Sequence, residues 1–204
     1  MKLIIIFAML LIFIGGCSKV QESQLEPTPN ASNNISGTLA LILSEKEISQ
    51  LGMTSEINEQ DLVQLGLNNG TNCRTDEDYT NVVDSSRGAY TLCVYNIKSL
   101  NNTQLIIELT KFTNYEALNG SYGYSSSHLF GAKGLISEND FGDQSRFHVS
   151  DPSDYGGEFN KPNEYYYNLY FTKELYLIHI TSGKDKEAKD YILKIGRKIL
   201  SKFE

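Results

Sequence analysis

The sequence has few of the residues from which most metal centres and hydrolytic sites are built. Its 204 residues include three His and three Cys, and nowhere do these show the close spacing of zinc ligands. It has no G-x-S-x-G segment that would place a serine nucleophile. We therefore expect no metal, no cofactor and no enzymatic activity.

Positive charge is also scarce. The chain has 18 Lys and Arg against 25 Asp and Glu, which gives a formal net charge of −7. Nucleic acids and anionic lipid surfaces are bound through basic surfaces. We expect no nucleic-acid partner, and no broad electrostatic contact between this chain and a membrane.

Only one long apolar run is present, at residues 3–16. These fourteen residues fall short of the ~20 that a helix needs to cross a bilayer. A basic residue before such a run, here Lys2, and small residues at its end are typical of a secretory signal peptide. We predict that residues 1–16 are a signal peptide.

The end of this run has a more specific pattern. Ile14-Gly15-Gly16-Cys17 resembles the lipobox of prokaryotic lipoproteins, in which an aliphatic residue and two small residues precede a cysteine. The resemblance implies that Cys17 is joined to a diacylglycerol and becomes the first residue of the mature protein, whose net charge is then −8 because Lys2 is lost. Two acyl chains hold a protein stably on a membrane. An ordinary signal peptide with a chance cysteine is the alternative.

The lipobox implies a place in the cell. The protein would be lipid-anchored at the cell membrane and face away from the cytoplasm, in the periplasm or on the cell surface. Residues 17–38 are rich in Pro, Ser, Asn and Gln, which is typical of a flexible linker behind the anchor. Residues 39–204 are long enough for a single globular domain with a core.

The two remaining cysteines are consistent with a location outside the cytoplasm. Cys73 and Cys93 form an even pair, and exported proteins meet an oxidising environment. A disulfide between them would close a loop of about twenty residues and stabilise the fold by ~3 kcal/mol. Two free buried thiols are the alternative, and a zinc site is disfavoured because no histidine lies near either one in the sequence.

Short elements are predicted first along the chain. Residues 39–43 form an apolar run that indicates a strand. Ser44 and Glu47 have the spacing of a helix-capping box. The phrases at 48–53 and 62–67, "ISQLGM" and "LVQLGL", predict two short helices, each ended by a glycine.

Two hairpins and two longer helices follow. Alternating apolar residues predict strands at 90–97 and 104–112, and again at 165–171 and 175–181. A second capping box at 113–116 predicts a helix, with Leu118, Tyr122 and Leu129 on one side and an end at Gly131. Residues 141–149 indicate a further strand, and 151–164 a loop.

The last helix has an apolar stripe with helical spacing, and Ser182 is its predicted N-cap. The stripe consists of Ala188, Tyr191, Ile192, Ile195, Ile199 and Phe203. We predict that it docks on the sheet rather than on a membrane.

Apolar residues on both faces of the strands require cover on both faces. We expect an α+β fold, an antiparallel sheet covered by helices as an α/β sandwich, with the two longer helices on one face and the short helices on the other. From Tyr90 onward the order of elements, the phrase "FGDQSRF" and the closing helix resemble PsbP-like domains. That resemblance implies an accessory protein that binds proteins or ions, without a shared catalytic residue set.

Candidate chemistry is limited. Ser145, Asp143 and His148 lie near one another in the sequence, but strand alternation puts Ser145 and His148 on opposite faces. We interpret Gly142-Asp143 as a turn. His179 is predicted to be a buried histidine with a hydrogen-bond partner, and it shows no metal spacing with His128 or His148. A Ca²⁺ ion at Asp151, Asp154 and Glu158 is disfavoured, since their spacing departs from that of Ca²⁺ loops.

The tyrosine-rich strand 165–171 offers a better candidate. One side has Tyr165, Tyr167, Leu169 and Phe171, the other Tyr166, Asn168 and Tyr170. One set is predicted to be core, and the other either roofs the sheet or forms a contact surface.

The function that we predict is a non-enzymatic binding or accessory domain of the cell envelope. Its partners would be the membrane, through the lipid on Cys17, and an envelope protein or small ligand. Two alternatives stay open: an envelope hydrolase with a site assembled from scattered residues, and an accessory subunit of a transport or secretion complex.

Overall fold

The computed structural model describes residues 35–67, 70–77, 86–127, 134–150, 165–183 and 185–204. All of them belong to one compact unit, Ala31–Glu204. The predicted signal peptide, Cys17 and most of the predicted linker lie outside these residues. So do His128, Leu129, Gly131 and the predicted loop 151–164.

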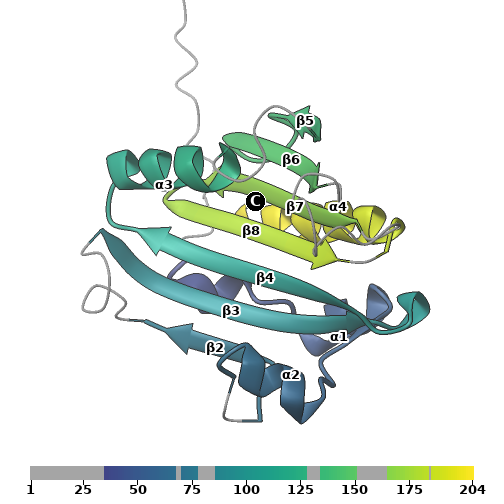
Figure 1. Cartoon of the computed structure of the whole chain (residues 1–204). Helices are drawn as coiled ribbons and strands as arrows, with labels where there is room; N and C mark the ends of the chain where they lie inside the picture. The colour runs from purple at the N-terminus through teal and green to yellow at the C-terminus, as the bar shows by residue number, and fades with distance from the viewer. Residues whose placement is uncertain (1–34, 68–69, 78–85, 128–133, 151–164, 184) are drawn as a thin grey trace, which may run out of the picture. The chain divides into compact units, whose positions relative to one another are not determined.

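An antiparallel sheet forms the centre of this unit (Figure 1). In chain order its strands are β1 (Met53–Thr54), β2 (Cys73–Asp76), β3 (Arg87–Ile97), β4 (Thr103–Phe112), β5 (Leu135–Glu138), β6 (Gln144–Ser150), β7 (Tyr166–Lys173) and β8 (Tyr176–Gly183). In space the order is β1-β3-β4-β8-β7-β6-β5, with β2 also paired to β3. Both predicted hairpins, β3–β4 and β7–β8, are confirmed, and they join through β4 and β8.

The helices are α1 (Glu45–Gln50), α2 (Glu59–Gln64), α3 (Tyr115–Ser127) and α4 (Ala188–Leu200). Short 3-10 turns occupy η1 (Thr38–Leu41), η3 (Lys98–Leu100) and η6 (Ser201–Phe203). Within the described part of the chain, every helix is too short or too polar to cross a membrane. The predicted α+β class, with a sheet, covering helices and a C-terminal helix, is confirmed.

The first predicted helix cap is confirmed and the second is displaced. At α1, the Ser44 hydroxyl accepts from the backbone of Glu47 while the Glu47 carboxylate accepts from the backbone of Ser44. At α3 the predicted box 113–116 is wrong, because Oδ1 of Asn114 caps the helix by accepting from the backbone N–H of Ala117 at 2.9 Å. Asn is as good an N-cap as Ser or Thr, so the helix begins one residue later than predicted.

Ser182 is not the N-cap of α4. It lies within β8, and its hydroxyl donates to the backbone oxygen of Gln104 at 2.8 Å. The chain turns at Asp185, whose carboxylate accepts from the backbone of Glu187, and α4 begins after that turn. The strand extends further than its apolar pattern, because the β4 pairing continues to Ser182.

Residues 39–43 do not form the predicted strand. They belong largely to η1, where Leu39 is 52% exposed while Leu41 is fully buried. An apolar run of this length fits a buried turn as well as a strand. The structure also contains β5, which was not predicted. Four strands therefore lie between α3 and α4 in the sequence, where three were expected.

The two longer helices lie on opposite faces of the sheet, which corrects the prediction that they share one. Ile192 and Ile195 of α4 are fully buried in the same cluster as Leu169 and Ile180. Leu118 and Tyr122 of α3 instead pack with Tyr170, Leu177 and Phe112. Side chains alternate between the two faces along a strand, so Tyr170 and Leu177 point away from Leu169 and Ile180. We call these the α4 face and the α3 face; α1 shares the first and α2 the second.

The predicted apolar stripe of α4 docks on the sheet, as expected. Ala188, Ile192, Ile195 and Ile199 are fully buried and Phe203 is 5% exposed. Gly196 allows a close approach, since a Cβ built on it would lie 2.8 Å from Cδ2 of Leu169 and 3.0 Å from Cε1 of Phe141. A larger residue there would have to push α4 away from β7.

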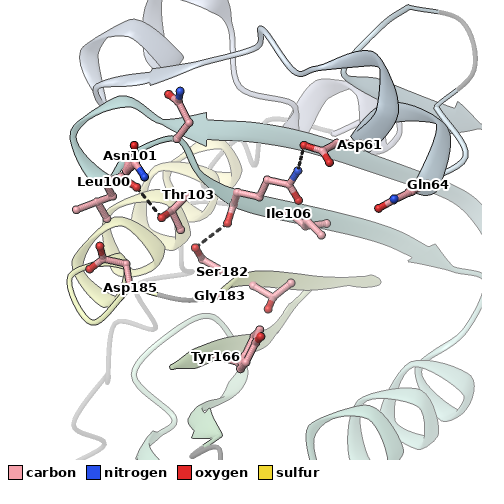
Figure 2. A pocket seen from close by; sticks show the side chains of 13 residues that line it. Asp61, Gln64, Leu100, Asn101, Thr103, Ile106, Tyr166, Ser182, Gly183 and Asp185 are labelled. Carbon is pink, nitrogen blue, oxygen red and sulfur yellow. Dashed lines mark hydrogen bonds between the residues drawn. The ribbon is translucent and has the colours of Figure 1, made fainter. Parts of the chain in front are cut away.

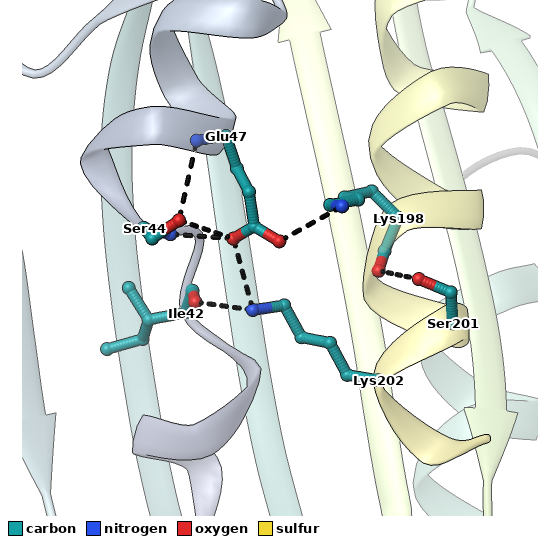
Figure 3. Close-up of polar contacts among 6 residues, drawn as sticks. All are labelled: Ile42, Ser44, Glu47, Lys198, Ser201 and Lys202. Atoms are coloured by element: carbon teal, nitrogen blue, oxygen red, sulfur yellow. Dashed lines mark hydrogen bonds and ion pairs between the residues drawn. The ribbon is translucent and has the colours of Figure 1, made fainter.

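An ion-pair cluster joins α1 to α4 and to η6, which directly follows α4 (Figure 3). The Glu47 carboxylate lies 3.2 Å from Nζ of both Lys198 and Lys202. Burial alone would raise the pKa of Glu47, but hydrogen bonds from Ser44 and from the two lysines outweigh it and lower this pKa to about 2. Lys202 also donates to the backbone oxygen of Ile42 at 3.0 Å. The cluster therefore holds the N-terminal segment around α1 against the C-terminal end of the chain.

A second contact ties the first described residues to the sheet. The hydroxyl of Tyr176, at the start of β8, donates to the backbone oxygen of Ile35 at 2.9 Å. Tyr176 itself is 2% exposed and packs edge-on against Phe203. The segment before α1 is therefore fixed to the middle of the sheet and to the C-terminal end of the unit.

Candidate functional site

The α3 face has two covered regions with polar residues between them. At one end, Leu62 of α2 and Leu67 pack on Val94 of β3. At the other, α3 packs on Tyr170 and Leu177. Figure 1 shows α2 and α3 over different parts of the sheet, with β4 and β8 between them. The residues of β4 and β8 that point to this face are candidates for a site.

A chain of hydrogen bonds crosses this middle region from β3 to β7. The Tyr90 hydroxyl donates to Oε1 of Glu108 at 2.7 Å. Oε2 of Glu108 lies 2.6 Å from Nδ1 of His179, and Nε2 of His179 lies 3.0 Å from Oδ1 of Asn168. The Tyr170 ring stacks on the His179 ring, with centroids 4.0 Å apart and planes at 3°. These side chains belong to neighbouring strands and hold one another in place.

The chain of hydrogen bonds also sets the charge state of its carboxylate. Burial would raise the pKa of Glu108, yet the hydrogen bonds from His179 and Tyr90 and the nearby charges of His179 and Arg87 together lower it. Glu108 is therefore a carboxylate that accepts from both sides. The prediction that His179 has a hydrogen-bond partner is confirmed, since both of its ring nitrogens face one.

A hollow of about 690 Å³ lies beside this chain on the same face (Figure 2). Four parts of the chain line it: α2, the turn between β3 and β4 with the start of β4, the start of β7, and the end of β8 with Asp185 after it. Its lining is mostly amides, hydroxyls and carboxylates, with one aromatic ring and two aliphatic side chains: Asp61, Gln64, Leu100, Asn101, Asn102, Thr103, Gln104, Ile106, Tyr166, Thr181, Ser182, Gly183 and Asp185.

The walls of the hollow are held by internal bonds. Oδ2 of Asp61 accepts from Nε2 of Gln104 at 2.7 Å and also from the Asn58 amide. Asn101 and Asn102 both have left-handed backbones, with φ of 51° and 57°. Asn tolerates this conformation better than most residues, and it turns the chain tightly from η3 into β4.

The aromatic side of the hollow depends on a glycine. A Cβ on Gly183 would lie 2.6 Å from Cε1 of Tyr166, so the ring lies directly against the glycine backbone of the neighbouring strand. Tyr166 belongs to the set with Asn168 and Tyr170, on the face opposite Tyr167, Leu169 and Phe171, which are buried on the α4 face. The division of the two sets between the faces is confirmed, but the second set is not left outside the core, since Asn168 is 6% and Tyr170 7% exposed and Tyr170 packs under α3. Tyr166 is the member of that set that lines the hollow.

The residues of the "GDQSRF" segment serve the turn and strand that were predicted for them. The Asp143 carboxylate accepts from Nζ of Lys173 at 3.1 Å and from the backbone of Glu174 at 2.9 Å. Ser145 is 2% exposed, and its hydroxyl accepts from the backbone of Phe141. Ser145 and His148 do not meet, which agrees with their alternation along β6.

His148 is buried on the α3 face, where it is the cross-strand neighbour of Asn168. Burial lowers the pKa of His148, which favours the neutral ring. Among the residues that the structure describes, no group of three or more His, Cys, Asp or Glu could hold a metal ion. Asp151, Asp154 and Glu158 lie outside those residues.

The structure pairs the remaining cysteines. Cys73 of β2 and Cys93 of β3 are opposite each other in the strand register and are joined by a disulfide. Cys93 is 1% exposed and faces the core of the α4 face. The bridge fastens β2, a short polar strand, to the edge of β3.

The lining of the hollow was missed from sequence because it combines four segments that are distant in the chain. One signal is present in the sequence: "SLNNT" at 99–103 joins the two predicted strands of the first hairpin, and asparagine tolerates the left-handed backbone that such turns use. The carboxylate of Asp61 and the ring of Tyr166 gave no local sign that they share a site. No protein-family model matches this chain, and comparison with curated proteins finds none that is detectably similar to it.

Proposed function

We propose that the protein is a lipid-anchored, non-enzymatic binding domain on the outer side of the cytoplasmic membrane or at the cell surface, and that its ligand or partner enters the hollow on the α3 face. The hollow is the observation that supports binding. It is concave, its walls are fixed by hydrogen bonds, and it presents polar groups around one aromatic ring, as ligand sites commonly do.

The lipid anchor rests on the lipobox pattern Ile14-Gly15-Gly16-Cys17. Its test is the variant Cys17→Ser, expressed in a prokaryotic host with lipoprotein processing. We expect this variant to stay as the unprocessed precursor or to leave the membrane fraction. A Cys17→Ser protein with the mature mass of wild type and normal membrane retention would refute lipidation.

Binding at the hollow is tested by photo-crosslinking in native membranes. A photoreactive residue at Asn102, in the hollow, is compared with one at Lys194, an exposed residue of α4 on the other face. We expect adducts from the first position and few from the second. Equal labelling at both positions would argue against a specific site.

We also propose that the domain from β3 onward is PsbP-like. From β3 onward the order is hairpin, helix, strands, helix, and an accessory role that brings envelope components together would fit that layout. Superposition on an experimental PsbP-like structure tests it: the shared strands must occupy the same order, β3-β4-β8-β7-β6, and a different order would remove the label.

One observation favours the alternative of an envelope hydrolase. Glu108 and His179 form a carboxylate–imidazole pair at 2.6 Å, an arrangement that orients a general base. Against it, the other nitrogen of His179 faces the Asn168 amide, whereas a hydrolase would need a nucleophile or water there. A screen with generic esters and phosphate esters decides: turnover that Glu108→Gln abolishes would establish an enzyme.

A further inference from the structure

We propose that the hollow on the α3 face binds a neutral saccharide. The inference rests on the proposed binding function and names the class of ligand for that site. The chemistry of the described lining residues points to it, in three steps.

The lining of the hollow offers both hydrogen-bond donors and acceptors. A side-chain amide offers both a donor and an acceptor, and a carboxylate offers two acceptor oxygens. A sugar has adjacent hydroxyls, each of which donates and accepts, so planar amides and carboxylates can pair with two of them at once. Gln64, Asn101, Asn102 and Gln104 supply amides, and Asp61 and Asp185 supply carboxylates.

The charged side chains among the described lining residues are all acidic. Among the described lining residues there are two carboxylates and no Lys or Arg; Lys184 lies outside the described residues. An anionic ligand such as a phosphate is normally held by cationic side chains or by a helix N-terminus. The two carboxylates disfavour an anion and suit a neutral polyhydroxyl compound.

Tyr166 lines the hollow and is partly exposed, while its ring lies against the backbone of Gly183. Aromatic rings combine a large apolar surface with a fixed geometry, and the C–H face of a pyranose packs on such a ring. Since Asp61 already holds the Gln104 amide, part of the site is preorganised, which lowers the entropic cost of binding.

Some lining groups are left to bind a ligand. The side chains of Gln64, Asn101, Asn102 and Thr181 make no hydrogen bond to other residues in the described part of the chain. Gln64, Asn101 and Asn102 are exposed. All three line the hollow, and Figure 2 shows Gln64 on the side of α2 and Asn101 on the side of the β3–β4 turn. A ligand could therefore bind them without breaking an existing bond.

The test uses the full chain purified in a polyoxyethylene detergent, because glycosidic detergents contain the ligand class in question. Three kinds of compound are titrated by calorimetry: a set of neutral oligosaccharides, spermidine and inorganic phosphate. We expect saturable binding of at least one neutral oligosaccharide and none of phosphate. Binding of spermidine or phosphate in place of any saccharide would overturn the ligand class but leave a binding site at the hollow.

Variants locate the binding. Asn102→Ala and Gln64→Ala should each weaken saccharide binding by about tenfold. Tyr166→Leu should weaken it by a similar factor, whereas Tyr166→Phe, which keeps the aromatic ring, should retain most of the affinity. Gln60→Ala is the matched control, because Gln60 is an exposed glutamine of the same helix and does not line the hollow. Equal effects of Gln64→Ala and Gln60→Ala would refute the site.

The source of the saccharide is resolved separately. Envelope fractions are tested for binding before and after periodate, which cleaves vicinal diols. Loss of binding after periodate indicates an envelope glycan, while binding only of free oligosaccharides indicates a soluble sugar. If no saccharide binds but the Asn102 crosslinker captures an envelope protein, the saccharide proposal fails and the binding function stands; if neither occurs, both fail.

Discussion

Replacing Gly196 by alanine sets two effects of known size against each other. Alanine is favoured over glycine inside a helix by ~1 kcal/mol. The new Cβ, however, would lie 2.8 Å from Leu169 Cδ2 and 3.0 Å from Phe141 Cε1, well inside the roughly 3.5–4.0 Å of an ordinary carbon–carbon contact. Leu169 is fully buried and Phe141 is 3% exposed, so neither side chain has free space to move into.

Overpacking of a tight core costs about 1–3 kcal/mol. It should therefore outweigh the gain in helix propensity, and we expect Gly196→Ala to lower the free energy of unfolding by about 1 kcal/mol. Gly120→Ala in α3 is the control, because a Cβ there meets nothing within 4 Å. It should raise the free energy of unfolding by about 0.5–1 kcal/mol.

Urea denaturation of both variants, extrapolated linearly to water, measures the two values. The difference between them isolates the contact of α4 with β7 and Phe141, since the change in propensity is common to both. A Gly196→Ala variant as stable as Gly120→Ala would mean that α4 does not lie as close to the sheet as described.

Three further outcomes are expected. Intact mass with and without reductant should differ by two protons if Cys73 and Cys93 are bridged, and reduction should destabilise the unit by ~3 kcal/mol for this loop; labelling of both thiols in unreduced protein would exclude the bridge. Glu47→Gln should cost about 1 kcal/mol at neutral pH, allowing for solvent screening of its pairs with lysine. Because the folded-state pKa of Glu47 is lowered from 4.5 to about 2, that stability is present above about pH 4.5 and is lost as the pH falls toward 2; melts of the two proteins that differ equally at pH 7 and pH 2 would contradict this. Ile195→Ala should cost ~2–5 kcal/mol as a fully buried residue, and a melting temperature within about a degree of wild type would remove α4 from the core.

Local patterns predicted the elements that contribute most to the core. Alternation along 165–171 and 175–181 identified β7 and β8, whose residues divide between the two faces: Leu169 and Ile180 are buried on the α4 face, Tyr170 and Leu177 on the α3 face. The stripe with helical spacing from Ala188 to Phe203 identified α4 together with its buried side. In each case the residues that make the pattern are those that lose contact with water, so the signal and the stabilisation have the same origin.

Elements that depend on distant partners were not predicted. β2, with the sequence CRTD, has no apolar alternation and becomes a strand through pairing with β3. The face that each helix covers follows from the strand order, which no single segment encodes. The hollow has the same origin, because Asp61, Asn102 and Tyr166 come together only when α2, the β3–β4 turn and β7 meet.

The bond between Tyr176 and Ile35 has a mechanical consequence. Tyr176 begins β8, which lies between β4 and β7 in the sheet, and Lys202 at the far end of the chain donates to the backbone of Ile42. A pulling force applied at Ile35 would therefore load a central strand and the C-terminal turn together, instead of peeling an edge strand away one bond at a time. The force would act at Ile35, near the start of the folded unit. Resistance to it would depend on Tyr176 and Lys202, which lie near the end of the sequence.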